Sequence, residues 1–201
     1  AFAFQYGDFQ IWNTDKVDAK INDRLKFKAE QELRFGNNVS EFYYTHTDGG
    51  FAFKAADALY FGVNYRLIYE KNSNGKWKLE NRPHVNATLK WKLYGFKFSD
   101  RNRMELRIRD GKDDVWRYRN ELTVKYPWKW TKMEIQPYTA DEIFVDLHSG
   151  NLSRNRIYNG FTFKLFEHLK GDLFYLWQIS RSDKAKWTAY NVLGIELKVV
   201  F

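Results

Sequence analysis

The chain has 201 residues, no cysteine and a formal net charge of +8, and it is 19% aromatic and 29% charged. The absence of cysteine excludes a disulfide framework and a thiolate metal site. No apolar run approaches the roughly 18 residues of a transmembrane helix, which excludes a helical membrane protein.

Alternation of apolar and polar residues recurs along the chain and predicts strands joined as hairpins. The first candidate is weak, because Asn13 and Asp15 interrupt its apolar face. Residues 1–8 are unassigned, although their alternating aromatics allow a short first strand. No linker divides the chain, so we expect one domain over residues 1–201. The candidate strands are 9–20, 24–35, 41–55, 59–69, 77–93, 96–109, 116–126, 131–147, 154–165, 173–179 and 187–201.

The lengths of these strands favour a membrane barrel. Most have about 12 residues or more, whereas strands of soluble proteins usually have about 5–6. A 12-residue strand tilted by about 45° rises roughly 28 Å, close to the ~25 Å apolar band of an outer-membrane barrel. We therefore predict an all-β fold, a single-chain antiparallel transmembrane β-barrel with short loops. A soluble lipid-binding barrel is the alternative.

The number of strands is a separate prediction. Single-chain bacterial barrels have even numbers of strands, with both ends of the wall in the periplasm. The wall then has 10 strands if 9–20 does not join it, or 12 if residues 1–7 add one. We expect 12.

The last stretch alternates regularly and is similar to the C-terminal signal that outer-membrane proteins present to the barrel-assembly machinery. The residues of this expected signal are Phe201, Val199 and Leu197. The pattern predicts the outer membrane of a Gram-negative bacterium, and because no signal peptide is visible, we expect a mature chain freed of it. The expected partners are the lipid bilayer and, during biogenesis, the assembly machinery.

Tryptophans fall near the predicted strand ends. With the last strand ending in the periplasm, one group lies at the outer end of the barrel and the other at the inner end. Such positions are typical of aromatic girdles at the two membrane interfaces. The outer group is Trp77, Trp116 and Trp187, and the inner group is Trp91, Trp128 and Trp130.

Charged residues occupy the other face of most strands and predict a charge-lined lumen. They alternate with apolar residues and mix both signs, so the net charge does not indicate nucleic-acid binding. Ion-pair ladders would satisfy such an interior, whereas rings of Arg and Lys would select anions. The predicted lumen residues are Lys26, Lys28, Glu30, Glu32, Arg34, Arg66, Arg101, Arg103, Glu105, Arg107, Arg109, Arg117, Arg119, Glu121, Arg154 and Arg156.

Three functions fit this pattern. The first is a barrel with a narrow interior that is either closed or a small anion-biased channel. The second is a non-conducting accessory subunit that binds another outer-membrane protein. The third and weakest is a lipid-modifying enzyme: only His148 adjoins a serine, Ser149, and adjacent strand residues face opposite sides. The four histidines show no metal-ligand spacing. We expect neither catalysis nor a cofactor.

Several short segments resemble a family of uncharacterised function, whose members are predicted outer-membrane barrels common in Bacteroidetes. The resemblance implies the same fold and compartment, and it carries no catalytic motif. The segments are Asp8-Phe9-Gln10-Ile11-Trp12, Glu30-Gln31-Glu32-Leu33-Arg34-Phe35, Tyr65-Arg66, Arg117-Tyr118-Arg119-Asn120-Glu121 and Arg154-Asn155-Arg156-Ile157-Tyr158-Asn159-Gly160.

Overall fold

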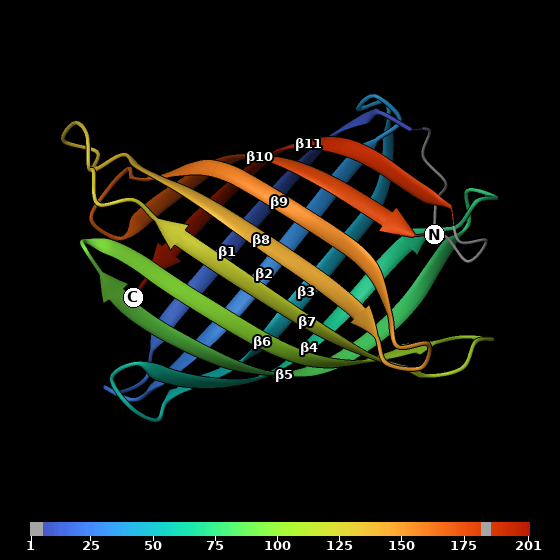
Figure 1. Cartoon of the computed structure of the whole chain (residues 1–201). Coiled ribbons are helices and arrows are strands. Elements are labelled where there is room, and N and C mark those ends of the chain that lie inside the picture. The colour runs from blue at the N-terminus through green and yellow to red at the C-terminus, as the bar shows by residue number, and fades with distance from the viewer. Residues whose placement is uncertain (1–5, 182–185) are drawn as a thin grey trace.

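A computed structural model describes residues 6–181 and 186–201, and it confirms the all-β closed barrel (Figure 1). The described residues contain no helix long and apolar enough to cross a membrane. The strands are β1 (Asp8–Lys20), β2 (Leu25–Gly36), β3 (Glu41–Lys54), β4 (Leu59–Lys71), β5 (Trp77–Leu93), β6 (Phe96–Arg109), β7 (Val115–Lys125), β8 (Gln136–Asp146), β9 (Asn151–Lys164), β10 (Leu169–Arg181) and β11 (Trp187–Val200).

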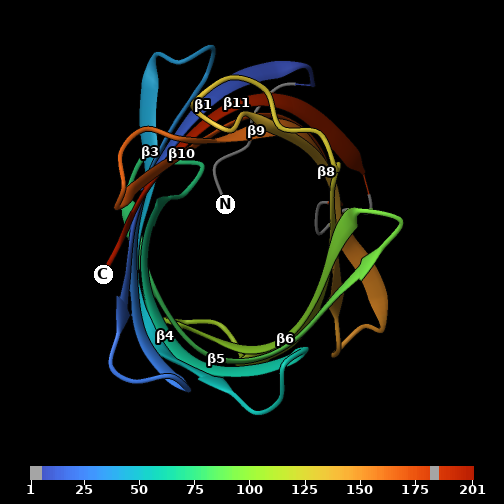
Figure 2. The ribbon, with the colours of Figure 1, turned by 90° about the vertical axis from the view of Figure 1, so that its left-hand side faces the viewer.

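Each strand pairs antiparallel with its neighbour in sequence, and β1 pairs parallel with β11 to close the ring (Figure 2). The parallel seam runs in register from Asp8 opposite Tyr190 to Asp18 opposite Val200. The start of β1 and the end of β11 therefore lie at opposite ends of the barrel (Figure 1). We call these ends the N rim, where β1 begins, and the C rim, where β11 ends.

The expected strand number of 12 is wrong, and so is the alternative of 10: the described residues form eleven strands. The weak first candidate does join the wall, because β1 pairs with both β2 and β11. An odd number of alternating strands leaves the first and last pointing the same way, so the closing pair is parallel. The proposed additional strand falls on residues 1–7. Residues 1–5 lie outside the described part of the chain, and Tyr6 and Gly7 form a turn.

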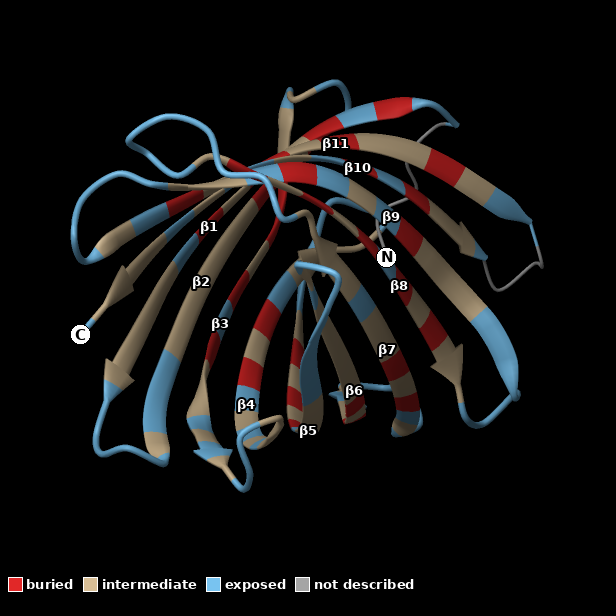
Figure 3. Ribbon diagram, turned by 60° about the vertical axis from the view of Figure 1, so that its left-hand side comes forward, coloured by how far each residue is buried: buried red, intermediate tan, exposed pale blue. Residues whose placement is uncertain are grey.

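Inner and outer faces alternate along each strand. In β1, for example, Gln10, Trp12 and Thr14 are buried, whereas Phe9 and Asp15 are exposed. Figure 3 shows this banding along the strands. The pairing registers show which side chains face the lumen. These are the even-numbered residues of β1–β5 and β8–β11 and the odd-numbered residues of β6 and β7. The rule does not extend past the register shifts at Arg34/Phe35 and Phe144/Val145.

The connection between β7 and β8 differs from the prediction. A strand was expected to begin at residue 131, but residues 126–135 form a turn closed by a bridge between Trp130 and Ile135, and β8 begins at Gln136. The predicted strands 116–126 and 131–147 left only residues 127–130 to connect them. The observed connection is longer and includes Pro127, which has no backbone donor for a strand.

Candidate functional site

The lumen has two chemically different halves. The half toward the N rim holds buried arginines, carboxylates and aromatic rings. The half toward the C rim holds exposed or half-exposed lysines and few acids. Since the two halves share the same strands, the difference lies in which residues occupy the inner face at each height.

Trp12 occupies the N-rim half of the lumen and is 2% exposed. The Arg34 guanidinium of β2 lies 3.6 Å from the centroid of its ring, and the Arg156 guanidinium of β9 lies 4.8 Å away. Leu176 and Val192 pack with Trp12 in one buried cluster. Side chains from the five neighbouring strands β9, β10, β11, β1 and β2 thus meet on the inner face.

Glu105 of β6 collects arginines from two neighbouring strands. It pairs with Arg117, accepts a 3.3 Å hydrogen bond from Arg119, and lies 3.8 Å from Arg82. Its side chain is completely buried. A buried carboxylate needs such compensation, because desolvation of an unpaired charge costs several kcal/mol.

Glu142 of β8 forms a second centre of the same kind. Its carboxylate lies 2.5 Å from Arg119, 3.1 Å from Arg101 and 3.3 Å from Arg156, and Tyr158 donates a 3.2 Å hydrogen bond to it. Because Arg119 contacts both carboxylates, one network spans β5 to β9.

Glu30 organises the opposite wall. It lies 3.3 Å from Lys16, 2.7 Å from His46 and 2.9 Å from Arg66. Lys16 also lies 2.5 Å from Glu196, which carries the network across the parallel seam into β11. Ion pairs therefore surround most of the lumen's circumference at this height.

The N-rim half is tightly packed around several inward-facing side chains. Gln10, Glu105, Leu176, Gln178 and Val192 face the lumen, yet each is 0% exposed. A water-filled path along the axis would leave inward-facing side chains accessible. These side chains come from two opposite walls, β10–β11–β1 and β6, and their inaccessibility indicates close packing of side chains there.

The predicted lumen residues divide between the two halves. Lys26 and Lys28 lie in the C-rim half and are exposed. Across the hairpin between β6 and β7, Arg101 faces Glu121 and Glu105 faces Arg117, while Arg103 faces Arg119. The rest of the predicted set faces the N-rim half, namely Glu30, Glu32, Arg34, Arg66, Arg107, Arg109, Arg154 and Arg156.

Sequence reasoning missed several central residues. Trp12 was missed because only the apolar face of its strand was considered, and the tryptophan lies on the opposite face. Glu142 was not among the predicted lumen residues, but it is 1% exposed inside the barrel. The alternation of β8, in which Tyr138, Ala140, Glu142 and Phe144 share one face, is the signal that places it in the lumen.

Aromatic side chains lie on the outer face near both rims. The N-rim group is Trp77, Trp116 and Trp187, and the C-rim group is Trp91, Trp128 and Trp130, all exposed. Near the C rim, Trp91 stacks on Phe98 with centroids 5.1 Å apart, and Tyr126 stacks on Trp128 at 5.3 Å.

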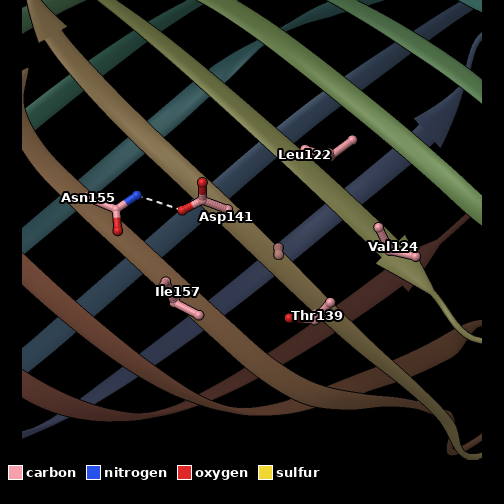
Figure 4. A pocket seen from close by; sticks show the side chains of 7 residues that line it. Leu122, Val124, Thr139, Asp141, Asn155 and Ile157 are labelled. Carbon is pink, nitrogen blue, oxygen red and sulfur yellow. Dashed lines mark hydrogen bonds between the residues drawn. The ribbon is translucent and has the colours of Figure 1, made fainter.

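The outer wall of β6–β9 carries polar residues halfway along its strands. Asn120 donates hydrogen bonds to Asp100 at 2.5 Å and to Asn102 at 3.2 Å. Asn155 donates one to Asp141 at 2.5 Å (Figure 4). A hollow of about 330 Å³ beside Asp141 is also lined by apolar side chains. We call Asp100, Asn102, Asn120, Asp141 and Asn155 the outer polar sector.

The residues considered for catalysis or metal binding lie apart from these features. His148 and Ser149 are exposed in the turn between β8 and β9. Among the described residues, no group of three or more histidines or carboxylates has the arrangement of a metal site.

Comparison with known proteins supports the fold and the family. A crystal structure of the beta domain of the Bordetella autotransporter Brka is similar, with a TM-score of 0.54, 11% identity, and coverage of 85% of this chain and 82% of that one. At this identity the similarity shows the fold alone, an outer-membrane-type barrel. No curated protein matches. The family model described as "Protein of unknown function (DUF2490)" matches residues 9–189, which confirms the expected resemblance, and the chain belongs to this family.

Proposed function

We propose that this protein is an integral outer-membrane barrel that is closed to ions and solutes. The proposal rests on one observation: inward-facing side chains from opposite walls are fully inaccessible in the N-rim half. Of the two states that the sequence allows, this favours the closed barrel over the anion-biased channel. The outward-facing aromatics near both rims and the similarity to an autotransporter β-domain support the membrane location.

Planar-bilayer recording tests the closed state. Purified protein is reconstituted and recorded in potassium chloride and in potassium glutamate, with a known porin as the positive control. We expect no single-channel steps above leak, because on this proposal the ion-paired network fills the lumen. Reproducible steps that scale with salt concentration would contradict the proposal.

Membrane location needs its own measurement. We expect the protein to co-fractionate with outer-membrane markers and to stay in the pellet after an alkaline carbonate wash, as integral proteins do. Release into the supernatant would instead favour the soluble lipid-binding barrel.

The outer polar sector favours a second function, that of an accessory subunit. In a bilayer, Asp100 and Asp141 would lie midway along the wall, where a charged side chain on the lipid face is costly. Asp100 accepts amide hydrogen bonds from Asn120 and Asn102, and Asp141 accepts one from Asn155. A partner with Arg, Lys or amide donors at the same depth would satisfy the remaining acceptor capacity. The expected partner is therefore another outer-membrane protein with such a donor surface.

Photo-crosslinking tests this second function. A photoreactive residue replaces Leu122 beside the sector, and the control position is Val85, which is exposed on the apolar outer face of β5. We expect a discrete adduct of larger mass from position 122 in native membranes and none from position 85. Absence of any adduct at 122, or equal labelling at both positions, would count against a docked partner.

A further inference from the structure

The C-rim half of the lumen is lined by lysines. Three acids share this part of the inner face: Asp18, Asp172 and Glu196. The excess of lysine over these acids is close to the net charge of the whole chain, +8. The lysines are Lys20, Lys26, Lys28, Lys90, Lys92, Lys97, Lys125, Lys164, Lys170 and Lys198, which we call the lysine ring.

Lysines of the ring face one another directly across neighbouring strands. Lys20 is opposite Lys26; Lys97 is opposite both Lys92 and Lys125; and Lys170 is opposite both Lys164 and Lys198. Like charges directly opposite each other in a sheet are destabilising. The fold therefore repeats an unfavourable pairing at three places around one mouth.

The other half of the lumen treats like charges differently. There, Arg103 also faces Arg119, but Arg119 is bridged to Glu142 at 2.5 Å and to Glu105 at 3.3 Å. Within the described residues, by contrast, no carboxylate lies within ion-pair distance of seven ring lysines. These are Lys26, Lys90, Lys92, Lys97, Lys125, Lys164 and Lys170.

Repulsion also extends across the lumen. The Lys198 ammonium of β11 repels those of Lys28 on β2, Lys90 on β5 and Lys125 on β7. Since β5 and β11 lie on opposite walls, the positive field reaches across the mouth. The connection between β7 and β8 lies at the same rim, and its carboxylate, Glu134, is already paired. Lys129 donates a hydrogen bond to Glu134, which lowers the pKa of the Glu134 carboxyl.

Guanidinium groups follow the lysines deeper into the lumen. On β6, Arg101 and Arg103 come after Lys97 and Ser99 on the same face. Arg103 is 7% exposed, and its Nη1 has no hydrogen-bond partner; nor does Nε of Arg101. Buried donors without partners are rare in folded proteins. The lysine-lined space thus has donors still to satisfy near its closed end.

We propose that the lysine ring is a binding site for an anion bearing several phosphate groups, held in a vestibule that opens at the C rim and ends at the closed half. Mobile ammonium groups on many strands suit a multivalent phosphate, since lysine binds phosphate as a point charge and requires no fixed geometry. Such a ligand bridges the opposed lysines in the way that Glu142 bridges the arginines. The site does not depend on whether the barrel conducts.

Inorganic tripolyphosphate is the test probe, titrated by calorimetry into the full chain in phosphatidylcholine nanodiscs. The test variant Lys26→Gln/Lys97→Gln/Lys170→Gln removes one lysine from each opposed run. The control Lys76→Gln/Lys78→Gln/Lys112→Gln removes the same charge near the N rim, where all three lysines are exposed. We expect the affinity to fall at least tenfold in the test variant and less than threefold in the control.

A second readout uses the unchanged protein. We expect tripolyphosphate to protect the ring lysines from an amine-reactive label while Lys76 and Lys112 continue to react. Repeating the titration in nanodiscs that contain phosphatidic acid separates two sources of phosphate: competition indicates a phosphorylated lipid headgroup, and unchanged affinity indicates a soluble polyphosphate. No binding by the wild type, equal losses in both variants or uniform protection of all lysines would overturn the proposal.

Discussion

The Arg34 guanidinium lies 3.6 Å from the centroid of the Trp12 ring, inside the barrel and one strand away. The contact joins a cation to an aromatic face, an attraction of about 2 kcal/mol or more when desolvated. It also places the bulkiest side chain of β1 where the chain closes on itself, since Trp12 packs with Val192 of β11.

Substitution of Trp12 by alanine should therefore destabilise the barrel. We expect a loss of about 3–5 kcal/mol in the free energy of unfolding, the range for large aromatic side chains removed from a core. The measurement is urea unfolding in lipid vesicles. Trp177→Ala, on the outer face of β10 and 38% exposed, is the control and should lose less than half as much. Equal losses would mean that Trp12 is not part of a packed lumen.

Neutralising Glu105 should be costly for a different reason. Glu105→Gln leaves Arg117 and Arg119 without one of their counter-charges in a buried site. Breaking a buried ion pair from one side costs about 3–5 kcal/mol. The exposed pair of Lys129 and Glu134 supplies the comparison: Glu134→Gln should leave the free energy of unfolding almost unchanged, because surface ion pairs contribute little. Similar small effects at both positions would argue that water enters the N-rim half.

Two adjacent glycines offer a sharp test of packing inside β3. A methyl group on Gly50 would collide with the carbonyl oxygen of Val63 and approach Cα of Asn64 to 2.7 Å, whereas one on Gly49 meets nothing within 4 Å. Gly50→Ala should lower the free energy of unfolding by about 1–3 kcal/mol. Gly49→Ala should stay within about 0.5 kcal/mol. The same urea titration compares them, and the reverse order would contradict the assignment of Gly50 to the inner face.

The parallel seam can be tested by cross-linking, with no background because the chain has no cysteine. Val17 of β1 faces Val199 of β11. Neighbouring strands lie about 4.8 Å apart, within the range of Cα separations that a disulfide spans. Val17→Cys/Val199→Cys should oxidise to a faster-migrating species on a non-reducing gel. Val17→Cys/Leu193→Cys, six residues out of register, should not. Oxidation of the second pair alone would require a different closure of the wall.

The strands themselves could be predicted, because inner and outer faces differ so strongly in polarity. The strand number could not. Eleven candidates were visible, but Asn13 and Asp15 made the first look unsuited to a wall, and the rule of even numbers favoured 12. Both residues lie on the outer face of β1, which is less apolar than the outer faces of the other strands. The inner face of β1 is regular, since Gln10, Trp12 and Thr14 alternate along it and are buried.

The partners within the lumen were only partly predictable. Hairpin neighbours such as Arg101 and Glu121 follow from a short turn, which fixes the register. Contacts that skip a strand, such as Arg66 with Glu30 at 2.9 Å, depend on side-chain reach across a curved wall. The lysine ring escaped notice for a related reason: its members are dispersed in sequence, and only the closed ring of strands brings them to one mouth.

We expect the parallel β1–β11 pair to form after the antiparallel hairpins. Every other strand pair joins sequence neighbours and needs only a short turn to form, whereas β1 and β11 are separated by nearly the whole chain. Contacts between distant segments carry the largest loop-closure entropy and form slowly. The pairing of Lys16 with Glu196 and the packing of Trp12 on Val192 exist only after closure. We therefore expect packing of the lumen to be completed late in folding, when the two ends of the meander meet.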